Sequence, residues 1–153
     1  MFAIVRIRGE VHTSPTVKKT MELLGLNRIS HMVLKPKTAQ MQSMLKNVES
    51  FAAFGEINAA TLALVLEKRG RLVGDKRLDA AFLKKHGAKS FEDLANQLLA
   101  GQTSLSKTGI KKVFRLNSPR KGFERGGIKK AFSNGGVTGY RANAINDLIK
   151  RMA

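Results

Sequence analysis

Apolar and polar positions alternate in the first stretch of the chain, FAIVRIR, which covers residues 2–8. One set of alternate positions is apolar throughout and consists of Ala3, Val5 and Ile7. The other set begins apolar and becomes basic at Arg6 and Arg8. A period of two residues with one apolar side predicts a β-strand that has one apolar face and one face that becomes basic.

A helical period replaces this alternation in SPTVKKTMELLG, residues 14–25. Ser14 can cap the helix N-terminus, and Pro15 suits the first helical position, where no backbone N–H is needed. Gly25 provides the stop, because glycine readily adopts the left-handed conformation that ends many helices. The apolar residues that share one face of this predicted helix are Val17, Met21 and Leu24.

The same order of strand and helix is repeated, and a third strand follows. Residues 30–35, SHMVLK, are predicted to form a strand that ends before Pro36. Thr38 can cap a second helix, whose apolar side chains at helical spacing are Met41, Met44, Leu45 and Val48. FAAFGEI, residues 51–57, has the pattern of the third strand. Residues 1–57 therefore predict a β-α-β-α-β unit with two layers.

Helical patterns dominate the second region, residues 58–103. Asn58 can cap the helix ATLALVLEKR, which Gly70 ends, and a short helix is expected at 76–86. Ser90, with an aspartate three residues later, resembles a capping box that opens the helix FEDLANQLLA. Each of these segments carries an apolar stripe, which predicts that they pack on a core and serve as scaffold.

The third region, residues 104–153, is predicted to end in a packed helix. KKVFRLN, residues 111–117, has the pattern of one more strand. The helix is expected to start at about Arg141, and Asp147 can pair with Arg151 one turn further on. Its apolar face consists of Ala142, Ile145, Leu148, Ile149 and Met152. A loop held between a strand and a packed helix is displayed by the protein, whereas a terminal tail would be loose.

The charge of the chain is strongly positive and unevenly distributed. The 153 residues hold 28 basic and 11 acidic side chains, a formal net charge of +17. Residues 104–153 alone hold 12 basic and two acidic side chains. Such an excess attracts polyanions and indicates a nucleic-acid partner, less often an anionic membrane surface. The C-terminal third is therefore the predicted contact region.

The stretch from 115 to 141 combines this charge with an unusual amount of glycine. It holds seven basic side chains, six glycines and one carboxylate, Glu124. Arginine and lysine bind phosphate, and glycine lets backbone N–H groups come close to it. We predict that residues 118–140 are poorly ordered until a polyanion supplies the missing countercharge. The predicted phosphate contacts are Arg120, Lys121, Arg125, Lys129, Lys130 and Arg141.

These features favour RNA over DNA as the partner. No segment has the pattern of a recognition helix, and no heptad repeat predicts a dimer. A flexible basic loop on a small globular body suits irregular folded RNA better than a regular duplex. Phe123, Phe132 and Tyr140 could stack on unpaired bases or fold back on the core, and folding back is the slightly favoured interpretation.

The sequence offers little for catalysis, metal binding or membrane insertion. Cysteine is absent, and His12, His31 and His86 have no metal-ligand spacing. No cofactor fingerprint or nucleophile–base pair is present, so we expect no enzyme, no cofactor and no metal site. No apolar run approaches the roughly 18 residues of a membrane span. The composition predicts a soluble, intracellular protein.

Several segments, taken in order, resemble one family. SPTVKKTMELLGLNRI and HMVLKPKTAQMQSMLKNV are similar to the core of large-subunit ribosomal protein thirty. FRLNSPRKGF, GGIK, FSNGGVTGYR and INDLIKRM are similar to the archaeal form, whose eukaryotic counterpart is large-subunit ribosomal protein seven. The resemblance covers essentially the whole chain, and the segments at 114–152 are its most specific part. Because the first strand begins at Phe2, we expect no long basic N-terminal extension of the eukaryotic kind, which favours the archaeal form.

The resemblance implies an α+β fold, ferredoxin-like in its β-α-β-α-β core, with a three-stranded antiparallel sheet backed by two helices and a helical, glycine-rich basic extension. It implies a structural role in the large subunit of the cytoplasmic ribosome. The implied partners are large-subunit ribosomal RNA and other large-subunit ribosomal proteins, with no membrane and no DNA. Lys35 and Lys37 are carried over as further RNA contacts. The implied loop-shaping residues are Gly126, Gly127, Gly135, Gly136 and Gly139.

The alternative from another class is a free-standing nucleic-acid-binding regulator or RNA chaperone that uses the same charges transiently. An RNA-modifying enzyme with an unrecognised site is a more distant alternative. A regulator that binds through charge alone would show equal affinity and equal salt dependence on RNA and DNA, whereas a ribosomal constituent has a shaped site. The sequence also leaves open whether residues 58–101 form a separate subdomain.

Overall fold

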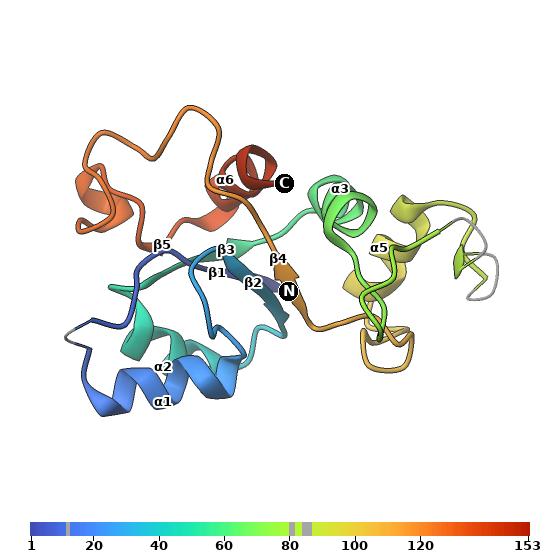
Figure 1. The fold of residues 1–153 in the computed structure, drawn as a ribbon, viewed down its shortest axis with the longest axis horizontal. Helices are drawn as coiled ribbons and strands as arrows, with labels where there is room; N and C mark the ends of the chain where they lie inside the picture. The colour runs from blue at the N-terminus through green and yellow to red at the C-terminus, as the bar shows by residue number, and fades with distance from the viewer. Residues whose placement is uncertain (12, 80–81, 84–86) are drawn as a thin grey trace.

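A five-stranded sheet with helices on both faces forms the centre of the protein (Figure 1). The computed structural model describes residues 1–11, 13–79, 82–83 and 87–153. The strands of the sheet are β1 (Phe2–Arg6), β2 (His31–Lys35), β3 (Ala52–Glu56), β4 (Val113–Arg115) and β5 (Gly139–Tyr140). Their order is β4-β2-β1-β3-β5, and neighbours are antiparallel except for β3 and β5, which are parallel.

The three strands expected from the first 57 residues form the middle of this sheet. Ile4 of β1 lies opposite Val33 in β2 and opposite Phe54 in β3. The sheet is wider than the expected three strands, because β4 and β5 add one strand at each edge. The strand expected at 111–117 is confirmed as β4. Both edge strands come from the C-terminal region, so segments far apart in the chain complete one sheet.

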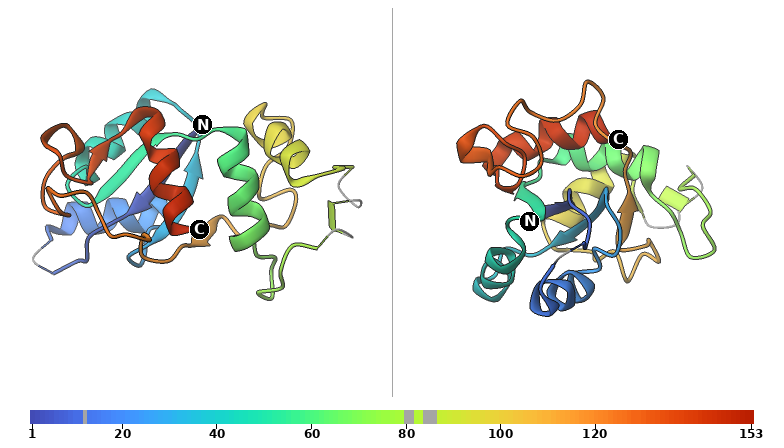
Figure 2. Two further views of the ribbon diagram at one scale, coloured as in Figure 1. Left: turned by 90° about the horizontal axis from the view of Figure 1, so that it is seen from above. Right: turned by 60° about the vertical axis from the view of Figure 1, so that its left-hand side comes forward.

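Helices cover both faces of the sheet (Figures 1 and 2). They include α1 (Pro15–Leu24), α2 (Ala39–Val48), α3 (Ala59–Arg69), α5 (Phe91–Leu99) and α6 (Ile145–Met152). α1 and α2 lie on one face, in a cluster with Ile4 and Phe54. α3 and α6 lie on the other face, in a cluster with Ala3 and Val5, and α5 packs against α3. Of the helix expected at 76–86, residues 80, 81 and 84–86 lie outside the described part of the chain, while residues 82 and 83 are helical and residues 76–79 are not.

The helices begin at the capping residues that the sequence predicts. Ser14, Thr38, Asn58 and Ser90 each lie just before a helix in an extended conformation. Each side-chain oxygen accepts a hydrogen bond from the backbone N–H three residues later, at 2.8–3.5 Å. These bonds satisfy donors that the first helical turn leaves free. Gly25, at φ +86°, ends α1 in the left-handed conformation, as predicted.

Both faces of β1 are buried, which corrects the expectation of a basic face. Arg6 is only 2% exposed, and its Nη1 donates to the backbone oxygen of Leu26 at 2.7 Å and to Oε1 of Glu10 at 3.2 Å. The guanidinium of Arg8 lies 4.8 Å from the centre of the Phe51 ring. Because helices cover both sides of the sheet, the Arg6 charge stabilises the fold and is not free to meet a phosphate.

The C-terminal helix α6 joins the last region of the chain to the central sheet. Its Asn146 side chain donates to the backbone oxygen of Glu56 at 2.9 Å and accepts from the backbone N–H of Asn58 at 3.0 Å. The buried apolar residues of α6 are Ile145, Leu148, Ile149 and Met152. One hydrophobic cluster contains these residues together with others from β1, α3 and α5. All three regions of the sequence therefore contribute residues to this one hydrophobic cluster.

Two details of α6 differ from the sequence-based expectation. The helix begins at Ile145 and not near Arg141, because a 3-10 turn, η2 (Ala142–Ala144), comes first. The ion pair expected within the helix is replaced by one between Arg151 and Glu124, at 2.8 Å. The last helix therefore also contacts the basic stretch that precedes it.

Replacing Leu148 by alanine tests the packing of α6. Leu148 is completely buried, so Leu148→Ala removes apolar contacts and leaves a cavity, which costs about 2–5 kcal/mol in comparable core positions. We expect a clearly lower thermal transition by circular dichroism. Lys150→Ala is the matched control, because Lys150 is exposed on the same helix and surface substitutions change stability by about 0.5 kcal/mol or less. Equal transitions for the two variants would contradict the packed helix.

Candidate nucleic-acid interface

The basic loop, residues 118–141, leads from β4 past α6 and returns to the sheet through β5 (Figures 1 and 2). Its entrance is bonded to the C-terminal end of α6. The backbone N–H of Asn117 donates to the oxygen of Met152, and that of Arg120 to the oxygen of Arg151, both at 2.9 Å. These bonds satisfy carbonyl groups that the last helical turn leaves free. The loop is thereby fixed to the helix at its start.

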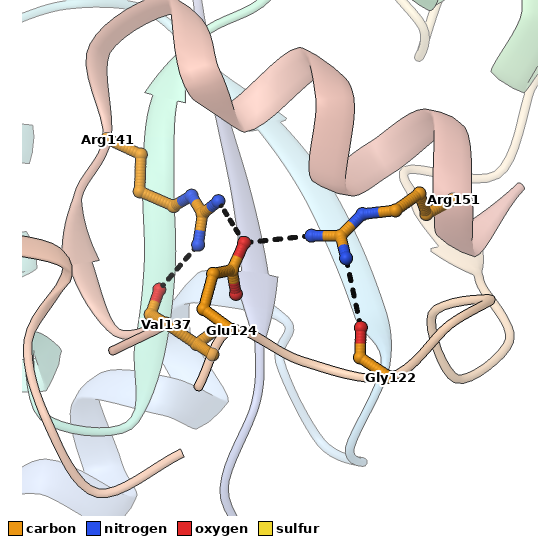
Figure 3. Close-up of polar contacts among 5 residues, drawn as sticks. All are labelled: Gly122, Glu124, Val137, Arg141 and Arg151. Atoms are coloured by element: carbon orange, nitrogen blue, oxygen red, sulfur yellow. Dashed lines mark hydrogen bonds and ion pairs between the residues drawn. The ribbon is translucent and has the colours of Figure 1, made fainter. Parts of the chain in front are cut away.

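The carboxylate of Glu124 holds the middle of the basic loop in place (Figure 3). Its Oε1 accepts from Nη2 of Arg141 at 2.6 Å and from Nη2 of Arg151 at 2.8 Å. Each arginine also donates to a backbone oxygen of the loop, Arg141 to Val137 at 3.3 Å and Arg151 to Gly122 at 3.0 Å. One carboxylate therefore joins the middle of the loop to α6, through Arg151, and to the C-terminal end of the loop, through Arg141.

The two arginines shift the pKa of Glu124. Burial by itself would raise this pKa, because a buried carboxylate loses its hydration. The hydrogen bond from Arg141, a backbone hydrogen bond and the positive charges of Arg141 and Arg151 outweigh burial, and they hold the pKa below its ordinary value of 4.5. The carboxylate is therefore ionised at neutral pH, where it stabilises the loop.

Arg141, predicted as an RNA contact, lies inside the protein. Its side chain is 3% exposed, and its guanidinium lies 4.3 Å from the centre of the Phe132 ring. Since Nη1 donates to Val137 and Nη2 to Glu124, Arg141 shapes the loop from within. The structure removes it from the group of cations that face solvent.

The other cations predicted in the loop face solvent. Their side chains are exposed, and among the described residues none of them donates to a carboxylate. These residues are Arg120, Lys121, Arg125, Lys129 and Lys130. Their mutual repulsion is thus left without an internal counterion, although Glu124 lies in the same loop. We refer to these five residues as the exposed cations.

The two lysines near the N-terminal core differ from each other. Lys35, at the end of β2, is half-buried. Lys37 is 52% exposed, but its Nζ is 3.0 Å from Oε1 of Glu56. This hydrogen bond, together with the charge of Glu56, raises the pKa of Lys37. Lys37 is therefore protonated at neutral pH, and the negative charge of Glu56 partly compensates its positive charge.

Glycines allow close backbone contacts within the basic loop. The backbone N–H of Gly126 donates to the oxygen of Gly135 at 3.0 Å, and a Cβ on Gly126 would lie only 2.5 Å from that oxygen. A Cβ on Gly136 would clash with the backbone of Lys130. The remaining glycines predicted to shape the loop have positive φ angles of 71–87°, and they are Gly127, Gly135 and Gly139.

Backbone hydrogen bonds connect distant parts of the loop. Besides the Gly126–Gly135 bond, the backbone N–H of Phe132 donates to the oxygen of Thr138 at 2.8 Å. Oγ1 of Thr138 donates to the oxygen of Lys130 at 3.0 Å. A short 3-10 turn, η1 (Phe132–Asn134), lies between these bonds. These contacts join distant parts of the loop, and the expectation that residues 118–140 are poorly ordered before binding stays a prediction.

The three aromatic side chains of this stretch have different surroundings. Phe123 is partly buried and packs against the main hydrophobic cluster. Phe132 is partly buried beneath the guanidinium of Arg141. Tyr140 is 48% exposed, although its hydroxyl donates to Glu56 at 2.9 Å. Phe123 and Phe132 therefore fold back on the protein, whereas Tyr140 retains a large exposed surface.

The described residues contain no group of three histidine, cysteine or acidic side chains placed to hold a metal ion. None of their helices is long and apolar enough to cross a membrane.

The residue that sequence reasoning missed is Glu124, because its partners are distant in the chain. The available signal was its position as the one carboxylate among seven basic side chains.

Replacing Glu124 by glutamine tests its role in the loop. Glu124→Gln keeps the shape of the side chain but removes the charge that two arginines share, so we expect stability at pH 7 to fall by about 1–3 kcal/mol. Thermal unfolding followed by circular dichroism measures this loss. Glu67→Gln, at an exposed position of α3, is the control and should leave the transition unchanged.

The effect of Glu124→Gln should depend on pH. A carboxyl group whose pKa is lower in the folded protein stabilises the fold above its unfolded pKa, near 4.5. That contribution is lost as the pH falls through the lower folded pKa. The stability difference between wild type and variant should therefore shrink when the pH is lowered from 7 to well below 4.5. A difference that stays constant over this range would contradict the ion-pair role.

Comparison with known proteins finds relatives that match nearly the whole sequence. A model of the ribosomal protein L30p/L7e family matches residues 2–51. The large ribosomal subunit protein uL30 of Methanococcus vannielii is 45% identical over 151 residues, which cover 99% of this chain and 98% of the relative. Its namesake in Nanoarchaeum equitans is 41% identical over 99% of this chain and 97% of the relative. That of Methanothrix thermoacetophila is 42% identical over 99% of both chains.

These relatives extend the match well beyond the 50-residue core to the C-terminal region with β4, β5 and α6. The resemblance drawn from the sequence, including its archaeal form, is thereby confirmed. The family is one of ribosomal proteins and not of enzymes. The chain belongs to the ribosomal protein L30p/L7e family.

Proposed function

We propose that this protein is a structural constituent of the large ribosomal subunit, and that it binds ribosomal RNA with the exposed cations of the basic loop. The relatives are named as large ribosomal subunit proteins. The observation that carries the RNA contact is the group of five exposed cations, which have no carboxylate partner among the described residues. RNA phosphates would supply the negative charge that these five side chains do not receive from the protein.

The chemistry of the loop suits phosphate in two ways. Arg120 and Arg125 offer planar forks of N–H donors, whereas lysines act as mobile point charges. Glycine without a side chain lets the backbone approach the RNA closely. Because Glu124 fixes the loop to α6, the cations are held on a shaped support, and less conformational entropy is lost on binding.

A second contact is proposed at the turn after β2. Lys35 has no carboxylate partner among the described residues and Lys37 has only the partly exposed Glu56, so both can turn toward a phosphate. The partners are large-subunit ribosomal RNA and neighbouring large-subunit proteins, in the cytoplasmic ribosome. No DNA contact is proposed, because a loop of this kind fits irregular RNA better than a regular duplex.

The alternative function, a free-standing regulator or RNA chaperone, predicts transient binding. Sedimentation of cell extracts through sucrose after a high-salt wash separates the two. A structural constituent remains with the large subunit, whereas a protein held by non-specific charge is released, because such binding weakens steeply with salt. Complete release at moderate salt would favour the regulator.

Removal of one exposed cation should weaken RNA binding in a measurable way. Lys129→Ala or Arg120→Ala should lower the affinity for a large-subunit ribosomal RNA transcript and reduce the slope of log K against log salt by about one unit for each lost phosphate contact. Filter binding over a salt series measures both quantities. Lys68→Ala on α3 is the matched control, because it removes the same charge from an exposed site outside the loop. Equal effects of all three variants would contradict a localised interface.

The same salt series on duplex DNA of equal length tests whether the interface is shaped. We expect RNA binding to persist at salt concentrations at which DNA binding has vanished. Equal affinities and equal slopes on the two nucleic acids would mean that the net charge of +17 acts without regard to structure.

A further inference from the structure

A recess with an aromatic lining lies where α2, the turn after β2 and the edge strand β5 meet. Its volume is about 390 Å³, within the roughly 300–1,000 Å³ of small-ligand sites. The side chains that give it chemical character are Phe2, Phe54, Tyr140, Lys37, Lys46 and Glu49. It is separate from the exposed cations, none of which lines it. We call it the aromatic recess.

The aromatic side of the recess is pre-organised. Phe2 and Phe54 are buried and meet edge to face, with ring centres 6.2 Å apart. The Tyr140 ring lies 5.8 Å from Phe54 and 6.5 Å from Phe2. Its hydroxyl donates to both oxygens of Glu56, at 2.9 and 3.0 Å. The tyrosine is therefore held at both ends of its side chain while 48% of its surface stays exposed.

Backbone pairing fixes the position of Tyr140 as well. Tyr140 lies opposite Phe54 in the parallel β3–β5 pair, and the next residue, Arg141, donates its backbone N–H to the oxygen of Phe54 at 2.8 Å. Arg141 is in turn held by Glu124. An exposed aromatic ring that is so firmly positioned loses little entropy when it stacks on a partner.

The charged residues around the recess suit a nucleotide. The positively charged side chains of Lys37 and Lys46 are exposed and could meet the phosphates on either side of a base. Glu49 extends from the end of α2 toward the backbone of Gly139. Among the described residues its carboxylate has no ion-pair partner. A free carboxylate would repel phosphate, but it can accept hydrogen bonds from the amino or imino edge of a base.

We propose that the aromatic recess receives one unpaired base of the RNA, which stacks on Tyr140 and donates to Glu49 while its flanking phosphates meet Lys37 and Lys46. The proposal rests on the proposed RNA-binding function and names a second, base-stacking contact within it. Such a contact depends on an aromatic face and not on net charge, so it is separable from the phosphate contacts of the basic loop.

The sole tyrosine of the chain provides a direct measurement. The protein has one tyrosine and no tryptophan, so its tyrosine emission comes from Tyr140 alone. Titration of the wild-type protein with a large-subunit ribosomal RNA transcript should quench this emission strongly, after correction for absorption with free tyrosine. RNA that binds without changing the emission would overturn the proposal. Because this measurement uses the unaltered protein, it does not depend on the folding of a variant.

Two substitutions complete the test. Tyr140→Leu removes the aromatic face and should weaken binding about tenfold without changing the salt slope, since no charge is lost. Tyr140→Phe keeps the ring and should bind like the wild type. Leu23→Ala, at a 64% exposed position on α1, controls for the loss of an exposed apolar side chain. Unaltered thermal transitions show that the variants are folded.

The outcomes separate this proposal from the proposed function. If Lys129→Ala weakens RNA binding but Tyr140→Leu does not, the aromatic recess fails as a base site and the phosphate interface stands. If Tyr140→Leu binds RNA normally but no longer joins the large subunit, the recess receives a protein side chain, and the base proposal is overturned. If the wild type binds no ribosomal RNA, the proposed function itself fails.

Discussion

The sharing of one carboxylate, Glu124, between two arginines is the constraint on which the basic loop depends. The loop comes from a region with 12 basic and two acidic side chains, so its folding requires at least part of the repulsion to be neutralised. Glu124 does so where the loop, α6 and the return toward the sheet meet. A partly buried carboxylate between two arginines is favourable only because hydrogen bonds compensate its lost hydration. Without it, Arg141 would be a buried, unpaired charge.

The basic residues include two groups with different roles. Arg6 and Arg141 are buried and bonded, so they stabilise the fold. The exposed cations have no carboxylate partner in the part of the chain that the structure describes. The division explains how a protein with a net charge of +17 folds and still presents charge to a polyanion. The positive charge is concentrated in the stretch that also completes the sheet through β5.

Fold and candidate interface are therefore built from the same segment. The C-terminal region contributes both edge strands and α6, and its hydrogen bonds to Glu56 and Asn58 join it to the centre of the protein. Parallel pairing of β5 with β3 also brings Tyr140 beside Phe2 and Phe54. Contact with RNA at the loop and at the aromatic recess would thus act on rigid elements, which favours a shaped interface over a diffuse one.

The sequence alone determined the features that depend on neighbouring residues. Strand and helix periods, the caps at Ser14 and Asn58, and the concentration of charge after residue 104 were all predicted, because each is a short-range pattern. Only the tertiary structure decided which charged side chains are buried and paired within the protein. The partners of Glu124 lie 17 and 27 residues away, and the burial of Arg6 requires helices on both faces of the sheet. No local pattern encodes contacts between residues so far apart in the sequence. Only the folded structure therefore shows which basic residues are the exposed cations.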